Sequence, residues 1–152
     1  MIKIFLIEDD PLMVNLYERV FKLSGYEVEV AFNGEEALKK LKTMKVIPTV
    51  ILMDVMMPVK NGLDTLKDIK QDPAYKDFKK IPVVMLTNLS GNEDAEKALL
   101  LGAVTYLVKS QYEPREVVAK VKEIVSAYSR ESDIPEVRVA IKNIKKDKKS
   151  GE

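Results

Sequence analysis

The sequence predicts an α/β protein in which a parallel five-stranded sheet is covered on both faces by helices. Five short apolar runs alternate with segments of helical periodicity along residues 1–129. Such alternation requires crossover connections, and these place helices on both sides of a parallel sheet. The chain has 152 residues, of which 46% are hydrophobic and 32% charged, so it is long enough to bury one globular core.

The strands are expected in the apolar runs at residues 2–7, 27–31, 49–53, 82–86 and 104–108. The first, third and fourth runs are almost continuously apolar, which is typical of parallel strands buried on both faces. The second run alternates polar and apolar residues, so we expect it at an edge of the sheet.

The first helix is expected over residues 11–24. Asp10 is placed to cap it, Pro11 suits its first position, and Gly25 follows its end. The apolar residues that recur at helical spacing in this segment are Leu12, Leu16 and Val20.

The remaining four helices follow similar signals. The second starts near residue 33, the third runs from about residue 62 and stops before residues 72–73, the fourth spans about 92–101, and the fifth starts at 113–114. The apolar residues expected to face the sheet are Ala37, Leu38, Leu41, Leu63, Leu66, Ile69, Val117, Val118, Val121, Ile124, Val125 and Tyr128.

A flavodoxin-like strand order, 2-1-3-4-5, is favoured over a Rossmann order because no Gly-x-Gly-x-x-Gly follows the first strand. In either order, ligands collect at the carboxyl ends of the strands. We expect residues 1–129 to form one domain. Residues 130–152 form a lysine-rich C-terminal extension, either frayed throughout or beginning with a short helix.

The composition excludes several kinds of site. The chain has no cysteine and no histidine, which excludes disulfides, thiolate zinc sites and imidazole catalysis. Lys and Arg number 25 against 24 Asp and Glu, so we expect neither nucleic acid nor a membrane surface as a partner. The N-terminus has no signal-peptide pattern, and a cytoplasmic location is expected.

Polar residues gather where the predicted strands end. The first strand ends in Glu8 and Asp9, the third in Asp54, the fourth in Thr87 and the fifth in Lys109. Strands one and three are neighbours about 4.8 Å apart, so the three carboxylates converge. A divalent cation would keep them ionised, and oxygen ligands suit Mg²⁺ together with a phosphate.

The same residues suit phosphoryl transfer. Asp54 would be the nucleophile that accepts the phosphoryl group, while the Thr87 hydroxyl and the Lys109 ammonium would hold the transferred anion. Taken singly, each residue also has an ordinary structural explanation: Asp54 as a loop carboxylate or a cap, and Lys109 as a solvated lysine.

Over about residues 1–128 the chain resembles the receiver domains of bacterial two-component response regulators. The matching motifs are, in chain order, Glu8 and Asp9, Asp54 with Met57, Pro58 and Gly62 after it, Thr87, Tyr106 and Lys109. The resemblance implies that a sensor histidine kinase or a phosphotransfer protein donates the phosphoryl group.

The resemblance also implies how Mg²⁺ is held. Asp9 would be the main protein carboxylate on the metal, with Asp54 and the backbone carbonyl of Met56 as further ligands. Glu8 would act through water, and Asp10 would cap the first helix.

A switch is the implied output. Phosphorylated Asp54 would draw Thr87 and Lys109 inward, and Tyr106 would fill the vacated space, which changes the surface of the fourth helix, fifth strand and fifth helix. Because few residues follow the fifth helix, we expect the signal to pass to a downstream protein target, a homodimer or a phosphorelay.

The chain departs from the family pattern in three places. Ser110 follows Lys109 where proline in a cis peptide is usual, so we expect a trans bond or visible strain. Asn88 is larger than the usual small residue and would crowd the phosphate entrance. Met56 and Leu89 are apolar where side chains influence attack by water, which predicts slow self-dephosphorylation.

Three alternatives were weighed. A haloacid-dehalogenase-type phosphatase needs Asp-x-Asp after its first strand, but the acids here are adjacent. A flavodoxin-type FMN carrier needs a hydroxyl- and glycine-rich phosphate loop there. A pseudo-receiver that binds partners without phosphorylation usually lacks an acid, the acceptor or the lysine, and all of these are present.

Overall fold

The structure, a computed structural model, describes residues 2–88 and 92–129. Strands and helices alternate along these ranges. Their bounds are β1 (Lys3–Ile7), α1 (Pro11–Leu23), β2 (Glu27–Ala31), α2 (Gly34–Thr43), β3 (Val50–Asp54), α3 (Gly62–Gln71), β4 (Val83–Thr87), α4 (Asn92–Leu100), β5 (Thr105–Val108) and α5 (Pro114–Ser129). Two 3₁₀ helices, η1 (Pro73–Phe78) and η2 (Lys109–Gln111), complete the described elements.

The strands form one parallel sheet in the order β2-β1-β3-β4-β5, which confirms the predicted fold class. The alternating strand β2 lies at an edge, as predicted. In the register, Ile7 pairs with Met53 and Asp54 pairs with Leu86. This register brings the end of β1 beside the end of β3.

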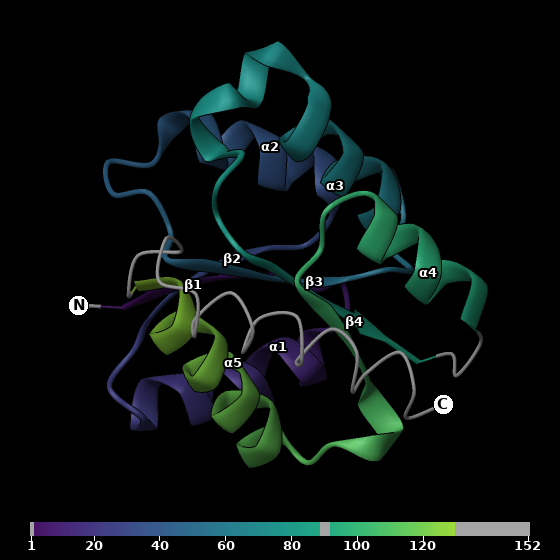
Figure 1. The fold of residues 1–152 in the computed structure, drawn as a ribbon. Helices are drawn as coiled ribbons and strands as arrows, with labels where there is room; N and C mark the ends of the chain where they lie inside the picture. The colour runs from purple at the N-terminus through teal and green to yellow at the C-terminus, as the bar shows by residue number, and fades with distance from the viewer. Residues whose placement is uncertain (1, 89–91, 130–152) are drawn as a thin grey trace.

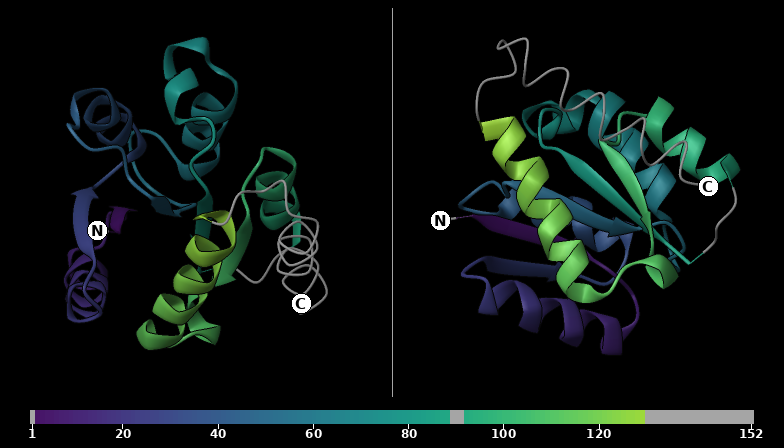
Figure 2. Two further views of the ribbon diagram at one scale, coloured as in Figure 1. Left: turned by 60° about the vertical axis from the view of Figure 1, so that its left-hand side comes forward. Right: turned by 60° about the horizontal axis from the view of Figure 1, so that its bottom comes forward.

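The helices form two layers around the sheet. Figure 1 shows α1 and α5 on one face and α2, α3 and α4 on the other, and Figure 2 shows the same layers from two further directions. Each face has its own apolar cluster, and among the described residues the two clusters have no member in common. The strands contribute to both clusters in alternation: Val50 and Leu52 pack towards α1 and α5, and Ile51 and Met53 towards α2–α4.

The predicted cap of α1 is confirmed. The Asp10 carboxylate accepts a hydrogen bond from the Leu12 amide at 3.0 Å. The side chains of Asn33 and Asn61 likewise cap α2 and α3, where each accepts a hydrogen bond from the backbone amide three residues further on.

The face that α1 buries differs from the predicted repeat. Leu12 is 78% exposed and Leu16 is 42% exposed, so the stripe they form points outward. The buried residues of this helix are Val14, Tyr17 and Phe21. Two large aromatic rings bury more apolar area than the leucines would, which explains why this face packs against the sheet.

The other differences are small. β3 and β4 end one residue later than predicted, so Asp54 and Thr87 are the last strand residues and do not follow the strands. η1 was not predicted, and α4 ends at Leu100. The predicted C-terminal extension, with its short helix, lies outside the described residues.

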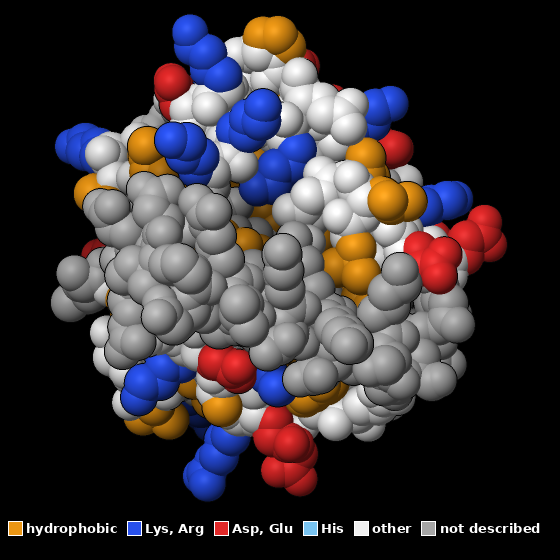
Figure 3. Space-filling model, viewed as in Figure 1, with side chains coloured by type: hydrophobic (Ala, Val, Ile, Leu, Met, Phe, Trp, Pro, Cys, Tyr) orange, Lys and Arg blue, Asp and Glu red, His pale blue; other side chains and the backbone are white. Residues whose placement is uncertain are grey.

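Both charge signs and scattered apolar side chains appear on the surface in Figure 3, which agrees with a formal net charge of +1. Within the described ranges, no helix combines the length and the apolar character that a membrane span requires.

Candidate functional site

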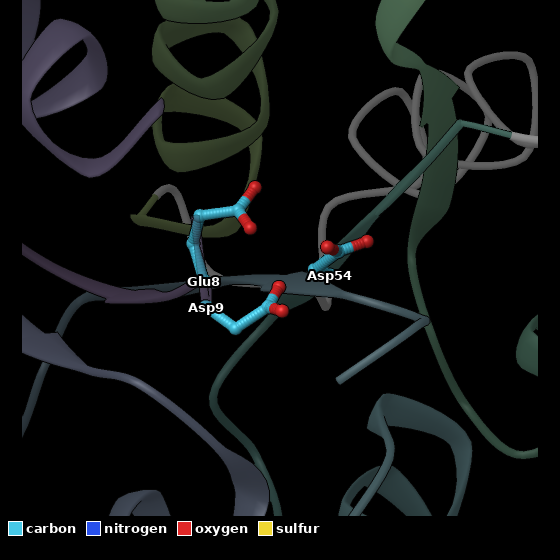
Figure 4. A group of neighbouring side chains, drawn as sticks. All are labelled: Glu8, Asp9 and Asp54. Carbon is cyan, nitrogen blue, oxygen red and sulfur yellow. The ribbon is translucent and has the colours of Figure 1, made fainter. Parts of the chain in front are cut away.

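Three carboxylates meet where β1 and β3 end. Glu8, Asp9 and Asp54 each offer one oxygen, and these oxygens lie within 4.8 Å of one another. Figure 4 shows Glu8 and Asp9 extending from the end of β1 towards Asp54 at the end of β3. They border a cleft of about 530 Å³, whose lining residues are Glu8, Asp9, Asp10, Met13, Asp54, Met56, Asn88, Lys109 and Ser110.

Lys109 joins two of these carboxylates. Its ammonium donates a short hydrogen bond to Glu8 Oε1 and a second one, at 3.1 Å, to Asp54 Oδ2. The other Glu8 oxygen accepts from the Asp10 backbone amide at 3.1 Å. Glu8 is fully buried, and each of its oxygens accepts a hydrogen bond from a protein donor. The ammonium of Lys109 compensates its charge.

Asp54 is different, because one of its oxygens is unsatisfied. Asp54 is 3% exposed, and its Oδ1 has no hydrogen-bond partner in residues 2–88 and 92–129. A buried acceptor without a partner costs about 1–3 kcal/mol. Asp9, whose side chain is exposed, also offers an oxygen within 4.8 Å of one Asp54 oxygen, and these carboxylates fit a hard divalent cation.

The pKa shifts agree with a crowded anionic site. Partial burial raises the pKa of Asp9 above its ordinary value of 3.8, and the neighbouring Glu8 raises it further. Burial alone would lower the pKa of Lys109, but the hydrogen bond to Glu8 and the charge of Asp54 outweigh it and raise this pKa above 10.5. Lys109 therefore stays protonated at neutral pH.

The loop after β3, residues 55–61, turns back sharply. The Gly62 amide donates to the Val55 carbonyl at 2.8 Å, and a Cβ on Gly62 would lie 2.1 Å from the Asp54 carbonyl oxygen. Only glycine fits there, which explains its place in the motif. The loop puts Met56, 59% exposed, at the mouth of the cleft.

Thr87 and Tyr106 lie on the opposite side of the sheet from the cleft-facing carboxylate of Asp54. By strand alternation, Thr87 shares the α2–α4 side with Met85, and Tyr106 belongs to the apolar cluster on that side. Both are buried, at 4% and 3% exposure, and within the described chain neither lines the cleft. Asn88, one residue further along, does line it.

Two of the residues of the predicted switch have defined positions. The Lys109 ammonium contacts Asp54 at 3.1 Å, and Tyr106 is buried at 3% exposure. The movement expected on phosphorylation stays a prediction.

The departures from the motif pattern have mixed outcomes. No cis peptide bond occurs in the described ranges, so the predicted trans bond between Lys109 and Ser110 is confirmed. Asn88 is exposed at the cleft, as expected. Leu89 lies outside the described residues.

Sequence reasoning missed Met13, which lines the cleft, although a helix starting at Pro11 puts its first turn beside the strand ends.

Comparisons with known proteins agree with this geometry. The family model described as "Response regulator receiver domain" matches residues 4–122. The alkaline phosphatase synthesis transcriptional regulatory protein PhoP of Bacillus subtilis (strain 168) is 37% identical over 141 residues, covering 93% of this chain and 54% of that protein. The chain thus spans about half the length of the curated relatives it matches.

Solved structures show the same fold. The chemotaxis response regulator CheY4 of Vibrio cholerae superposes with a TM-score of 0.70 at 30% identity, covering 82% of this chain and 98% of that one. The phosphorylated cyanobacterial phytochrome response regulator RcpA gives a TM-score of 0.70 at 29% identity, covering 82% and 93%.

Proposed function

The chain belongs to the response regulator receiver domain family, whose members act as phosphorylation-dependent signalling domains, and on this premise we propose that Asp54 accepts the phosphoryl group. The donor is a histidine kinase or a phosphotransfer protein. The observation that carries the proposal is the Asp54 carboxylate. One of its oxygens is held by Lys109, and the other is buried with no hydrogen-bond partner among the described residues.

In the proposed reaction, an Asp54 oxygen attacks the phosphorus of a phosphohistidine. The bond from phosphorus to the imidazole nitrogen breaks, the aspartyl phosphate forms, and the imidazole leaves with the electron pair. Lys109 neutralises the phosphoryl oxygens from the Asp54 side of the cleft, where its ammonium already lies 3.1 Å from the nucleophile.

A Mg²⁺ ion fits the donor set. It would be held by Asp9, Asp54 and the backbone carbonyl of Met56, while Glu8 acts through water because both of its oxygens are engaged. When bound, the ion supplies positive charge that offsets the phosphoryl oxygens and the crowded carboxylates.

The output depends on the far side of the sheet. Phosphorylated Asp54 would draw the Thr87 hydroxyl around the end of β4 towards the cleft, and Tyr106 would repack with it, which changes the surface of α4, β5 and α5. A downstream partner protein or a second copy of the chain would read that surface.

The donor is expected to approach across α1. The cleft is bordered by Met13 from this helix, and the outward stripe formed by Leu12 and Leu16 offers exposed apolar area beside it. An apolar stripe of this kind suits a partner helix that carries a phosphohistidine.

The direct test is phosphorylation by acetyl phosphate. We expect the wild-type chain, incubated with acetyl phosphate and Mg²⁺, to gain the mass of one phosphoryl group in intact-mass spectrometry, and we expect Asp54→Ala to gain none. A wild-type chain that stays unmodified would make this a pseudo-receiver. A mass gain that persists in Asp54→Ala would assign the acceptor elsewhere.

The partner predictions differ in support. A histidine kinase partner follows from the family. The absence of a nucleic-acid partner stays a prediction, since the relatives are named as transcriptional regulators and this chain covers about half of their length. Affinity capture with beryllofluoride-treated protein would identify the downstream partner.

The family match leaves no support for the phosphatase and FMN-carrier alternatives.

A further inference from the structure

We propose that Lys60 is a positioning residue, which fixes the loop of residues 55–61 against α2 and α3 and so holds the Met56 side of the cation site in place. The inference rests on the proposed function, because it concerns the same site. Lys60 is not among the described residues that line the cleft, and it would act through the loop backbone.

The loop has few other restraints. It is closed at its base, where the Val55 amide donates to the Leu86 carbonyl at 2.9 Å and the Gly62 amide donates to the Val55 carbonyl at 2.8 Å. Between these points Met57 is buried, but Met56 is 59% exposed and Val59 is 75% exposed. Packing alone therefore leaves the outer part of the loop weakly held.

The loop also contains a strained turn. Val59 has a φ of 68°, a left-handed conformation that is unfavourable for a β-branched side chain. The Lys60 amide donates to the Pro58 carbonyl at 2.7 Å, which closes a three-residue turn around Val59. A turn of this kind persists only where the surrounding structure holds it.

The other two polar groups of Lys60 supply that support. Its carbonyl accepts a hydrogen bond from the Gly34 amide, at the start of α2, at 3.1 Å. Its ammonium forms a close ion pair with Asp68 on α3. The Lys60 backbone is thus tied to one neighbouring helix and its side chain to the other.

The contact with α2 has no spare room. A Cβ on Gly34 would lie 1.8 Å from Thr65 Oγ1 and 2.9 Å from the Lys60 carbonyl oxygen. The Thr65 hydroxyl in turn donates to the Asn61 carbonyl at 2.7 Å. The loop therefore cannot move towards α2, and the ion pair with Asp68 opposes movement away from it.

The ion pair is partly exposed, with the Lys60 and Asp68 side chains 31% and 29% accessible. A pair at this exposure contributes little to the stability of the whole fold. Its loss should therefore appear in the loop and in cation affinity, and hardly in the melting temperature.

The test compares Lys60→Met with the wild-type chain. The substitution keeps the amide, the carbonyl and most of the side-chain length but removes the ammonium. We expect the dissociation constant for Mg²⁺, measured by calorimetric titration, to rise about tenfold, as is typical when support of a metal ligand is lost. In the metal-free protein, the Gly34 amide should exchange with deuterium faster.

Asp68→Asn should reproduce both effects, and Lys60→Arg should retain wild-type behaviour because it keeps the ion pair. Lys67→Met, which removes an exposed lysine from α3, is the matched control and should change neither readout. If Lys60→Met binds Mg²⁺ as the wild type does, or if only its melting temperature falls, the positioning role is wrong. If the wild-type chain itself binds no Mg²⁺, the proposed function fails first and this inference fails with it.

Discussion

The Lys109 ammonium lies 3.1 Å from Asp54 Oδ2 while it also holds the fully buried Glu8. One cation is thus shared by two buried carboxylates, and a third carboxylate, Asp9, lies within reach of both. The site is therefore short of positive charge in the metal-free protein, and this imbalance leads to several measurable expectations.

Removing the shared cation should destabilise the fold. Lys109 is 9% exposed, so Lys109→Met leaves Glu8 buried without its partner. We expect the free energy of unfolding at pH 7 to fall by about 3–5 kcal/mol in urea titrations. Because the folded-state pKa of Lys109 is raised, its contribution is complete below pH 10.5 and is lost above it, so the two proteins should converge at strongly alkaline pH. Equal stabilities at pH 7 would contradict the shared-cation view.

Removing Asp54, the proposed acceptor, should have the opposite effect. Asp54→Ala deletes Oδ1, which has no partner in the part of the chain that the structure describes, and leaves Lys109 paired with Glu8. We expect the metal-free variant to be about 1 kcal/mol more stable than the wild type. Saturating Mg²⁺ should raise the melting temperature of the wild type but not that of the variant. Thermal denaturation with EDTA or Mg²⁺ measures both effects, and a variant that is less stable under EDTA would refute this account.

Asp9 should give the metal-free protein a mild pH dependence. The pKa of Asp9 is raised above 3.8 in the folded state, so ionised Asp9 lowers the free energy of unfolding at neutral pH. This destabilisation is lost as the pH falls through the raised pKa and Asp9 becomes protonated. Asp9→Asn should therefore be slightly more stable than the wild type at pH 7, by no more than about 0.5 kcal/mol because the side chain is exposed. The difference should disappear below the ordinary pKa of 3.8, where Asp9 is protonated in both the folded and the unfolded state, and a difference that grows towards acid pH would contradict this account.

Met56 should slow the loss of the phosphoryl group. Its exposed apolar side chain lies at the cleft and offers no hydrogen bond to an attacking water. We expect Met56→Asn, once labelled with acetyl phosphate, to lose its label about tenfold faster than the wild type, because the amide would orient water. Intact mass followed over time gives both rates. Faster decay in the wild type would reject the prediction.

Much of the fold could be predicted because its signals are local. The continuous apolar character of β3, the Asp10 cap and the acidic residues where β1 and β3 end all lie within short stretches of sequence. The parallel register then brings Glu8 beside Asp54 without further information.

Other features depend on packing that no short stretch encodes. Leu12 and Leu16 have the right spacing for a buried face, but they are exposed, and Tyr17 and Phe21 are the buried side chains of α1. The hydrogen bond to Glu8 Oε1 comes from Lys109, which is 101 residues away in the chain. The ion pair of Lys60 likewise required coordinates, since no motif joins it to α3.

The two apolar clusters lie on opposite faces of the sheet, so they separate the buried side chain of Tyr106 from the elements that pack with α1 and α5. Side chains alternate between the two faces along a strand, so Glu8 after β1 and Lys109 after β5 lie on the side of α1 and α5. Tyr106 packs on the side of α2–α4. We therefore expect substitutions on the exposed face of α4 to leave the contacts among Glu8, Asp54 and Lys109 unchanged.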